Sequence, residues 1–86
     1  MEFNKEGKVN RYKNLDEILK LNISESLQEE FKRKFNKKIY FERNGNCKIG
    51  KLIGLEINEQ LSEQFYIIEV EDKTIYISCN NSITLL

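Results

Sequence analysis

The spacing of apolar residues changes at about residue 38, from a helical period to a strand period. Before this point apolar residues recur every three or four positions, and after it they alternate with polar residues in short runs. Residues 1–13 are mostly polar, so they form either a flexible arm or an extended segment held by Val9 and Tyr12. We therefore expect one domain over residues 1–86, with a polar arm (1–13), a helical part (14–36) and a strand part (38–86).

Two short helices are predicted in the helical part. Asn14 is suited to cap the first helix, and either Ser24 or Ser26 starts the second, which is expected to cover residues 25–36. Glu30 precedes Lys34 by four residues, which is a favourable order for an ion pair on a helix. The second helix carries one narrow apolar stripe, formed by Leu27, Phe31 and Phe35.

Five strands are predicted in the rest of the chain. Asn44-Gly45 is a strong hairpin signal, because a type I′ turn needs a positive φ at both central positions. The long second strand contains Gly50, where we expect a bulge or a sharp bend, and we expect Ile49 and Leu55 to share one face of it. The predicted strands cover residues 39–43, 46–57, 65–71, 74–79 and 83–86.

These elements predict an α+β fold, in which two short N-terminal helices pack on a small five-stranded antiparallel β-barrel. Several strands are apolar on both faces, and one face would fill the barrel. The other face carries Tyr40, Phe65, Ile67 and Tyr76, with Leu52 as a further candidate, and we expect the stripe of the second helix to cover it from outside. If the helix does not cover these three aromatic residues, they are natural anchors for a protein partner.

The stretch from Asn44 to Ile57, followed by the alternating run from Phe65 to Val70, resembles the opening hairpin and the middle strand of SH3-like and KOW-type barrels. The resemblance covers about residues 38–86. It implies a binding module, because such barrels usually bind peptide or nucleic acid. The chain departs from the pattern of proline-peptide binders, since it has no tryptophan and no proline. It also departs from the basic hairpin of RNA binders, since only Arg43, Lys48 and Lys51 are basic here.

The net charge is zero, but the two halves of the chain differ. Residues 1–38 hold ten Lys/Arg against seven Asp/Glu, and residues 39–86 hold four against seven. The basic run 32–38 is either the solvated last turn of the second helix or a contact for phosphates or an acidic partner. If this run lies beside the hairpin, it forms a larger basic patch with Arg43 and Lys48. The candidate partner-binding residues are therefore Lys32, Arg33, Lys34, Lys37, Lys38, Arg43 and Lys48, together with Tyr40, Phe65 and Tyr76.

The residues offer little for catalysis. The chain has no histidine, which excludes Ser-His-Asp and Cys-His arrangements and histidine-bound metals. Cys47 and Cys79 are too few for a zinc site, and each is expected to be a small buried apolar residue. We expect no catalytic residue, no metal and no cofactor.

The expected function is a non-enzymatic binding module that regulates or inhibits a protein partner. The alternative is a nucleic-acid-binding module of the SH3-like or KOW type that uses the basic run 32–38. A third reading is self-assembly through the short last strand, and the oligomeric state stays open. No segment has the length or apolar character of a signal peptide or a membrane span, so cytoplasmic location is expected. The many Asn, Lys and Ile residues favour an AT-rich source such as a bacterium, a phage or a mobile element.

Overall fold

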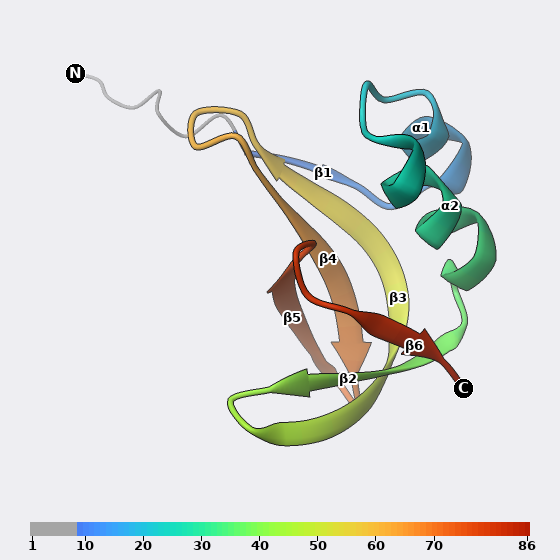
Figure 1. Cartoon of the computed structure of the whole chain (residues 1–86), viewed down its shortest axis with the longest axis vertical. Helices are drawn as coiled ribbons and strands as arrows, with labels where there is room; N and C mark the ends of the chain where they lie inside the picture. The colour runs from blue at the N-terminus through green and yellow to red at the C-terminus, as the bar shows by residue number, and fades with distance from the viewer. Residues whose placement is uncertain (1–8) are drawn as a thin grey trace.

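The computed structural model describes residues 9–86 (Figure 1), which form two short helices and an antiparallel sheet of six strands. The α+β class and the five predicted strands are confirmed. Residues 1–8, which belong to the predicted polar arm, lie outside the described residues. The elements are β1 (Val9–Tyr12), α1 (Leu15–Leu19), α2 (Glu25–Lys34), β2 (Lys38–Arg43), β3 (Asn46–Asn58), β4 (Glu63–Val70), β5 (Lys73–Ser78) and β6 (Ile83–Leu85).

The sheet has the strand order β5-β4-β3-β2-β6, and β1 pairs with β3. β1 is the sixth strand, so the extended alternative for Val9 and Tyr12 is the one that the structure shows. β5 and β6 are the two ends of the order and do not pair with each other. The sheet is therefore open, and the predicted barrel is not confirmed.

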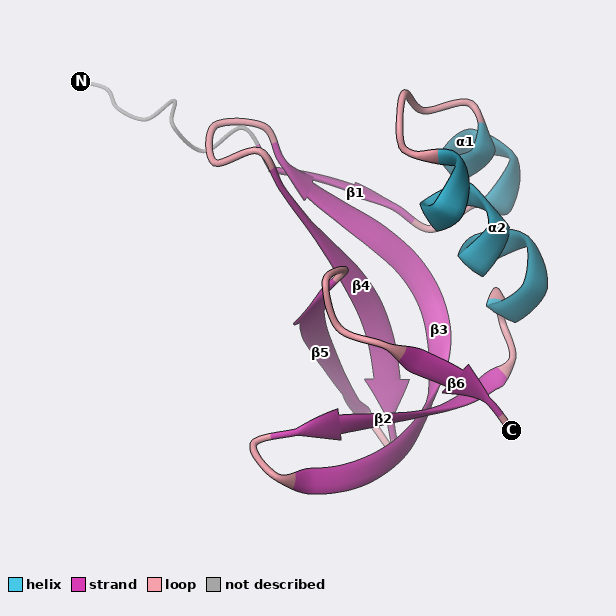
Figure 2. Cartoon of the chain, in the orientation of Figure 1, coloured by secondary structure: helices cyan, strands magenta, loops and turns pink. Residues whose placement is uncertain are grey.

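Both helix starts are set by side-chain caps. The Asn14 Oδ1 accepts a hydrogen bond from the Glu17 N–H at 3.2 Å, as predicted. Of the two candidate serines, Ser24 is the one that caps α2, since its Oγ accepts from the Leu27 N–H at 3.1 Å. The helices lie together on one side of the sheet (Figure 2).

α2 ends at Lys34, earlier than predicted, because the next residues bond to the sheet instead of continuing the helix. Asn36 has a positive φ of 63°, which asparagine tolerates well. Its N–H donates to the Leu52 carbonyl at 2.7 Å, and the Leu52 N–H donates to the Lys37 carbonyl at 3.3 Å. These bonds fasten the end of α2 to the middle of β3.

β3 is the strand on which the sheet is organised (Figure 1). One edge pairs with β4 from Lys51 to Asn58. The other edge pairs with β2 from Asn46 to Lys51 and with β1 from Leu55 to Asn58. The predicted Asn44-Gly45 turn joins β2 to β3 and has positive φ at both positions, 54° and 79°. The two-residue turn Asn44-Gly45 therefore directly precedes β3, which pairs with β1, β2 and β4.

The bulge of β3 lies at Ile53, where the register with β4 shifts between Leu52 and Gly54. The prediction of a bulge at Gly50 is wrong, because Gly50 pairs in regular register with Ile39. Gly50 serves close packing instead: a Cβ there would lie 2.7 Å from the backbone oxygen of Glu69.

The bulge also corrects the prediction that Ile49 and Leu55 share a face. An extra residue between them reverses the alternation, so Leu55 is buried while Ile49 is 53% exposed. We use "inner face" for the side of the sheet that carries Leu55 and the buried core, and "outer face" for the opposite side.

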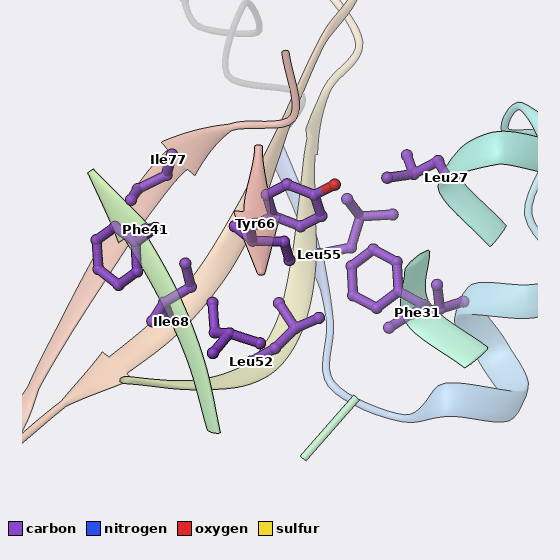
Figure 3. Close-up of a cluster of buried hydrophobic side chains, with 11 residues drawn as sticks. Leu27, Phe31, Phe41, Leu52, Leu55, Tyr66, Ile68 and Ile77 are labelled. Atoms are coloured by element: carbon purple, nitrogen blue, oxygen red, sulfur yellow. The ribbon is translucent and has the colours of Figure 1, made fainter. Parts of the chain in front are cut away.

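The core lies between the inner face and α2 (Figure 3). Phe31 is fully buried, and its ring centroid is 5.7 Å from that of Tyr66 on β4. The prediction that α2 covers the outer face is therefore wrong, and Leu52, a candidate for that face, is fully buried on the inner face. A closed barrel fills its interior with its own side chains, whereas this open sheet is completed by the helix stripe. Core residues from the strands include Ile39, Phe41, Leu52, Leu55, Tyr66, Ile68, Ile77 and Ile83.

Candidate functional site

Lys34 does not belong to an exposed basic run. It is 5% exposed, and its Nζ donates to the Glu30 carboxylate and, at 2.6 Å, to the carbonyl oxygen of Ile83 on β6. The predicted Glu30–Lys34 pair is confirmed. Lys34 is buried and already donates to two acceptors. The structure therefore does not support it as a partner-binding residue.

The other cations do not form the predicted patch at the hairpin. Lys38 and Arg43 stand at opposite ends of β2, so about 17 Å separates them at the usual rise of a strand. Lys38 instead pairs in register with Lys51 of β3, and both are exposed. Lys32, Arg33 and Lys37 are also exposed, with Lys32 bonded to Glu29 at 3.4 Å. Lys38 therefore lies beside Lys51, which was not among the candidate partner-binding residues.

The predicted aromatic anchors lie on the outer face, which α2 leaves uncovered. Tyr40 is 41% exposed and stands beside Ile49 on β3. Tyr76 of β5 is 37% exposed, and Phe65 on β4 is half-buried. Tyr40 belongs to the β2–β3 hairpin, whereas Phe65 and Tyr76 belong to the β4–β5 hairpin. The three aromatic residues therefore do not form one continuous site.

Tyr76 has a cation above its ring. The guanidinium carbon of Arg11 on β1 is 5.3 Å from the ring centroid, and the Arg11 Nε donates to Glu56 at 2.8 Å. This bond is the main reason why the pKa of Arg11 is raised. Sequence reasoning missed Arg11, since nothing in the chain order shows that β1 reaches the outer face near β5.

β5 has an open edge, and its hydrogen-bonding groups can be assigned from the register. The Cys79 N–H donates to the Gln64 carbonyl at 2.9 Å. Bonded and non-bonded pairs alternate along antiparallel strands, so Ile77 and Ile75 bond to β4. The N–H and C=O groups of Thr74 and Tyr76 consequently point away from the sheet. Within residues 9–86, β5 has no strand on that side, and no backbone bond is made by those groups.

β6, at the other end of the sheet, is protected at Ile83. The Leu86 N–H donates to the Lys38 carbonyl at 3.2 Å, which by the same alternation turns the carbonyl of Ile83 outward. That carbonyl accepts from the buried Lys34 Nζ. Self-assembly through the last strand is thus opposed by α2 at Ile83, whereas the outward groups of Leu85 have no backbone partner within residues 9–86.

Arg43 and Lys48 line a hollow beside the start of β5. Its volume is about 250 Å³, and its other lining residues are Val70, Glu71, Lys73 and Ile75. Three of these six side chains are cationic and one is acidic. We call this the basic hollow. The sequence singled out Arg43 and Lys48 but missed Lys73, which reaches them only because the β2–β3 and β4–β5 hairpins lie close together.

A second hollow, of about 270 Å³, lies between α2 and the turn that follows β5, and Tyr66 and Cys79 both line it. Burial raises the pKa of the Cys79 thiol to about 12 and also raises that of the Tyr66 hydroxyl. Both groups are therefore protonated at neutral pH, in which state a thiol is a poor nucleophile.

Cys47 differs from its prediction. It is exposed on β3 rather than buried, because the β2–β3 hairpin projects beyond the core. Its Sγ is 2.9 Å from the Tyr40 hydroxyl, and this hydrogen bond is the main reason why the pKa of Tyr40 is raised. Among residues 9–86, no cluster of three or more His, Cys, Asp or Glu residues could hold a metal ion. In the same range, no helix has the length and apolar character that a membrane crossing requires.

Comparison with protein-family models, with curated proteins and with solved structures finds no match to this chain.

Proposed function

We propose that this chain is a non-enzymatic binding module, which regulates or inhibits a protein partner by accepting an extended segment of it at the outer edge of β5. The observation that carries the proposal is the open edge itself. The backbone groups of Thr74 and Tyr76 point outward beside the exposed Tyr76 ring. Adding a strand to such an edge is a common mode of peptide recognition, in which backbone bonds supply affinity and side chains supply specificity.

The contrast between the two outer strands supports this function. Native proteins usually protect a sheet edge against pairing with other chains. At β6 the outward carbonyl of Ile83 is bonded to Lys34, whereas the outward backbone groups of Thr74 and Tyr76 on β5 have no backbone bond within residues 9–86 and lie beside the exposed Tyr76 ring. The β5 edge is therefore the longer of the two open edges, and this supports it as the docking site.

The relationship to SH3-like barrels is part of the same proposal. β3 pairs with β2 along its first half and with β4 along its second half, and its alternation is reset by the bulge at Ile53. This long, bent strand supports an opened SH3-like barrel, in which the gap between β5 and β6 replaces the closing strand pair. The resemblance implies a binding role and not a particular partner.

Replacing Thr74 with proline is expected to abolish partner binding and leave the fold intact. Proline removes the outward N–H of Thr74, and an edge strand tolerates proline where that N–H does not bond to its neighbour. Peptides selected from a random library on the wild-type chain should bind the Thr74→Pro variant roughly tenfold more weakly or worse, since an edge bond is lost and the ring obstructs the edge.

The matched control is Thr74→Val, which keeps the N–H and should keep binding. Selected peptides that bind the Thr74→Pro variant as tightly as the wild type would contradict the proposal, because their site would then lie away from the β5 edge.

The alternative is nucleic-acid binding, and one observation favours it. Arg33 in the last turn of α2 and Lys37 and Lys38 after it are exposed, and Lys38 has Lys51 as its cross-strand neighbour. These cations could neutralise a few phosphates, so binding would fall steeply with salt. An electrophoretic shift at low salt that Lys38→Glu with Lys51→Glu removes would favour this alternative.

A further inference from the structure

We infer that the segment accepted by β5 is acidic, and that a carboxylate of this segment enters the basic hollow. The inference rests on the proposed function, which it deepens by naming the chemistry of the partner.

The hollow lies on the inner side of the edge strand. Lys73 and Ile75 are two residues apart on β5, so both side chains point to the inner face, where Ile75 packs against the core. Arg43 and Lys48 reach the hollow from the two strands of the β2–β3 hairpin. A side chain of an added strand that lies next to Lys73 would therefore meet a site built from two hairpins.

The charge of the hollow selects the occupant. Arg43, Lys48 and Lys73 are opposed by the single carboxylate of Glu71. An incoming Asp or Glu would relieve repulsion among the three cations, and the Arg43 guanidinium can bind a carboxylate through two parallel hydrogen bonds. An incoming Lys or Arg would add a fourth cation to the same space, which disfavours a basic segment.

The floor of the hollow gives the position of an apolar residue. Val70 and Ile75 are both partly buried and pack against the core. Side chains of an added strand alternate between the two faces, so the next inner position lies beside Ile75. The partner segment should therefore carry an acidic residue beside Lys73 and an apolar residue two positions away beside Ile75. Its intervening residue would lie on the outer face next to Thr74.

A second copy of this chain fits the hollow less well than an acidic segment does. β5 reads Lys-Thr-Ile-Tyr-Ile-Ser and holds no carboxylate. If two β5 edges paired, the second strand would contribute another lysine and no carboxylate.

The test is an NMR titration of the full ¹⁵N-labelled chain with three synthetic peptides of about ten residues, a typical upper length for one strand. The peptides share an alternating valine–threonine background and differ at two inner positions, which are glutamate, glutamine or lysine. The glutamate peptide should shift the amides of Thr74 and Tyr76 and bind roughly tenfold more tightly than the lysine peptide. The variant Arg43→Glu, Lys48→Glu, Lys73→Glu should reverse this order, whereas Lys32→Glu on α2 should not change it.

The outcomes separate the two proposals. If all three peptides shift the β5 amides with equal affinity, the edge accepts strands but the acidic preference is refuted. If no peptide shifts those amides, both the inference and the edge-binding function are refuted. Shifts of the β5 amides that depend on protein concentration alone would identify a second copy as the occupant. Tighter binding of oligothymidylate than of the glutamate peptide, at the same residues, would identify a phosphate backbone. Either of the last two results overturns the inference.

Discussion

Replacing Phe31 with alanine is expected to lower the free energy of unfolding by about 4 kcal/mol, the usual range for a buried phenylalanine being about 3–5 kcal/mol. Phe31 is fully buried and contacts the strands through Tyr66, at 5.7 Å between ring centroids. The ring fills the space between α2 and the inner face, so its removal leaves a cavity in the core. Urea denaturation followed by circular dichroism measures the loss.

Phe35 is the matched control for Phe31. Its ring is 6.5 Å from that of Phe31 in the same stripe, but it is only partly buried. Phe35→Ala should therefore cost clearly less. Equal costs for the two variants, or a cost below about 1 kcal/mol for Phe31→Ala, would contradict the assignment of α2 to the inner face.

Replacing Lys34 with alanine is expected to cost about 3 kcal/mol, at the lower end for a broken buried ion pair because Glu30 keeps some exposure. The change also leaves the outward carbonyl of Ile83 without its donor. We further expect the variant to associate at high concentration, because the β6 edge loses its protection. Urea denaturation measures the first effect and light scattering the second.

Lys32→Ala provides the control, since Lys32 lies on the same helix and pairs with Glu29 at the surface, where both side chains are more than half exposed. Such a pair is worth about 0–1 kcal/mol. A Lys34→Ala variant as stable and as monomeric as Lys32→Ala would show that Lys34 neither holds the core nor guards β6.

The elements that the sequence predicted well are those fixed by local chemistry. Asn44 and Gly45 accept positive φ values, so the β2–β3 turn was readable from two residues. Asn14 and Ser24 are side-chain caps that act within three residues of their own position. The positions of the strands followed from alternation in the same way.

The features that were missed depend on contacts distant in the chain. The bulge lies at Ile53 and not at Gly50, because glycine here allows the close approach of β4 rather than an extra residue. The position of the bulge decides which face of the sheet Ile49 and Leu55 occupy. No local pattern distinguishes the two roles of a glycine in a strand.

For one candidate residue that proved to be buried, the sequence did hold a signal. Lys34 lies seven positions after Leu27 and three after Phe31, which places it on the apolar stripe of α2. A lysine on the buried side of a helix is expected to have a partner. Arg11 and Lys73 had no such signal, since each joins its site through the topology of the sheet.

The central claim is that the outer edge of β5 is an open strand position, and amide hydrogen exchange of the free chain tests it most directly. The amides of Ile75 and Ile77 bond to β4 and should be protected, whereas those of Thr74 and Tyr76 point outward and should exchange far faster. Strict alternation of fast and slow amides along β5 is the predicted result. Uniform protection from Thr74 to Ile77 would show that the edge is already covered, and would contradict the claim.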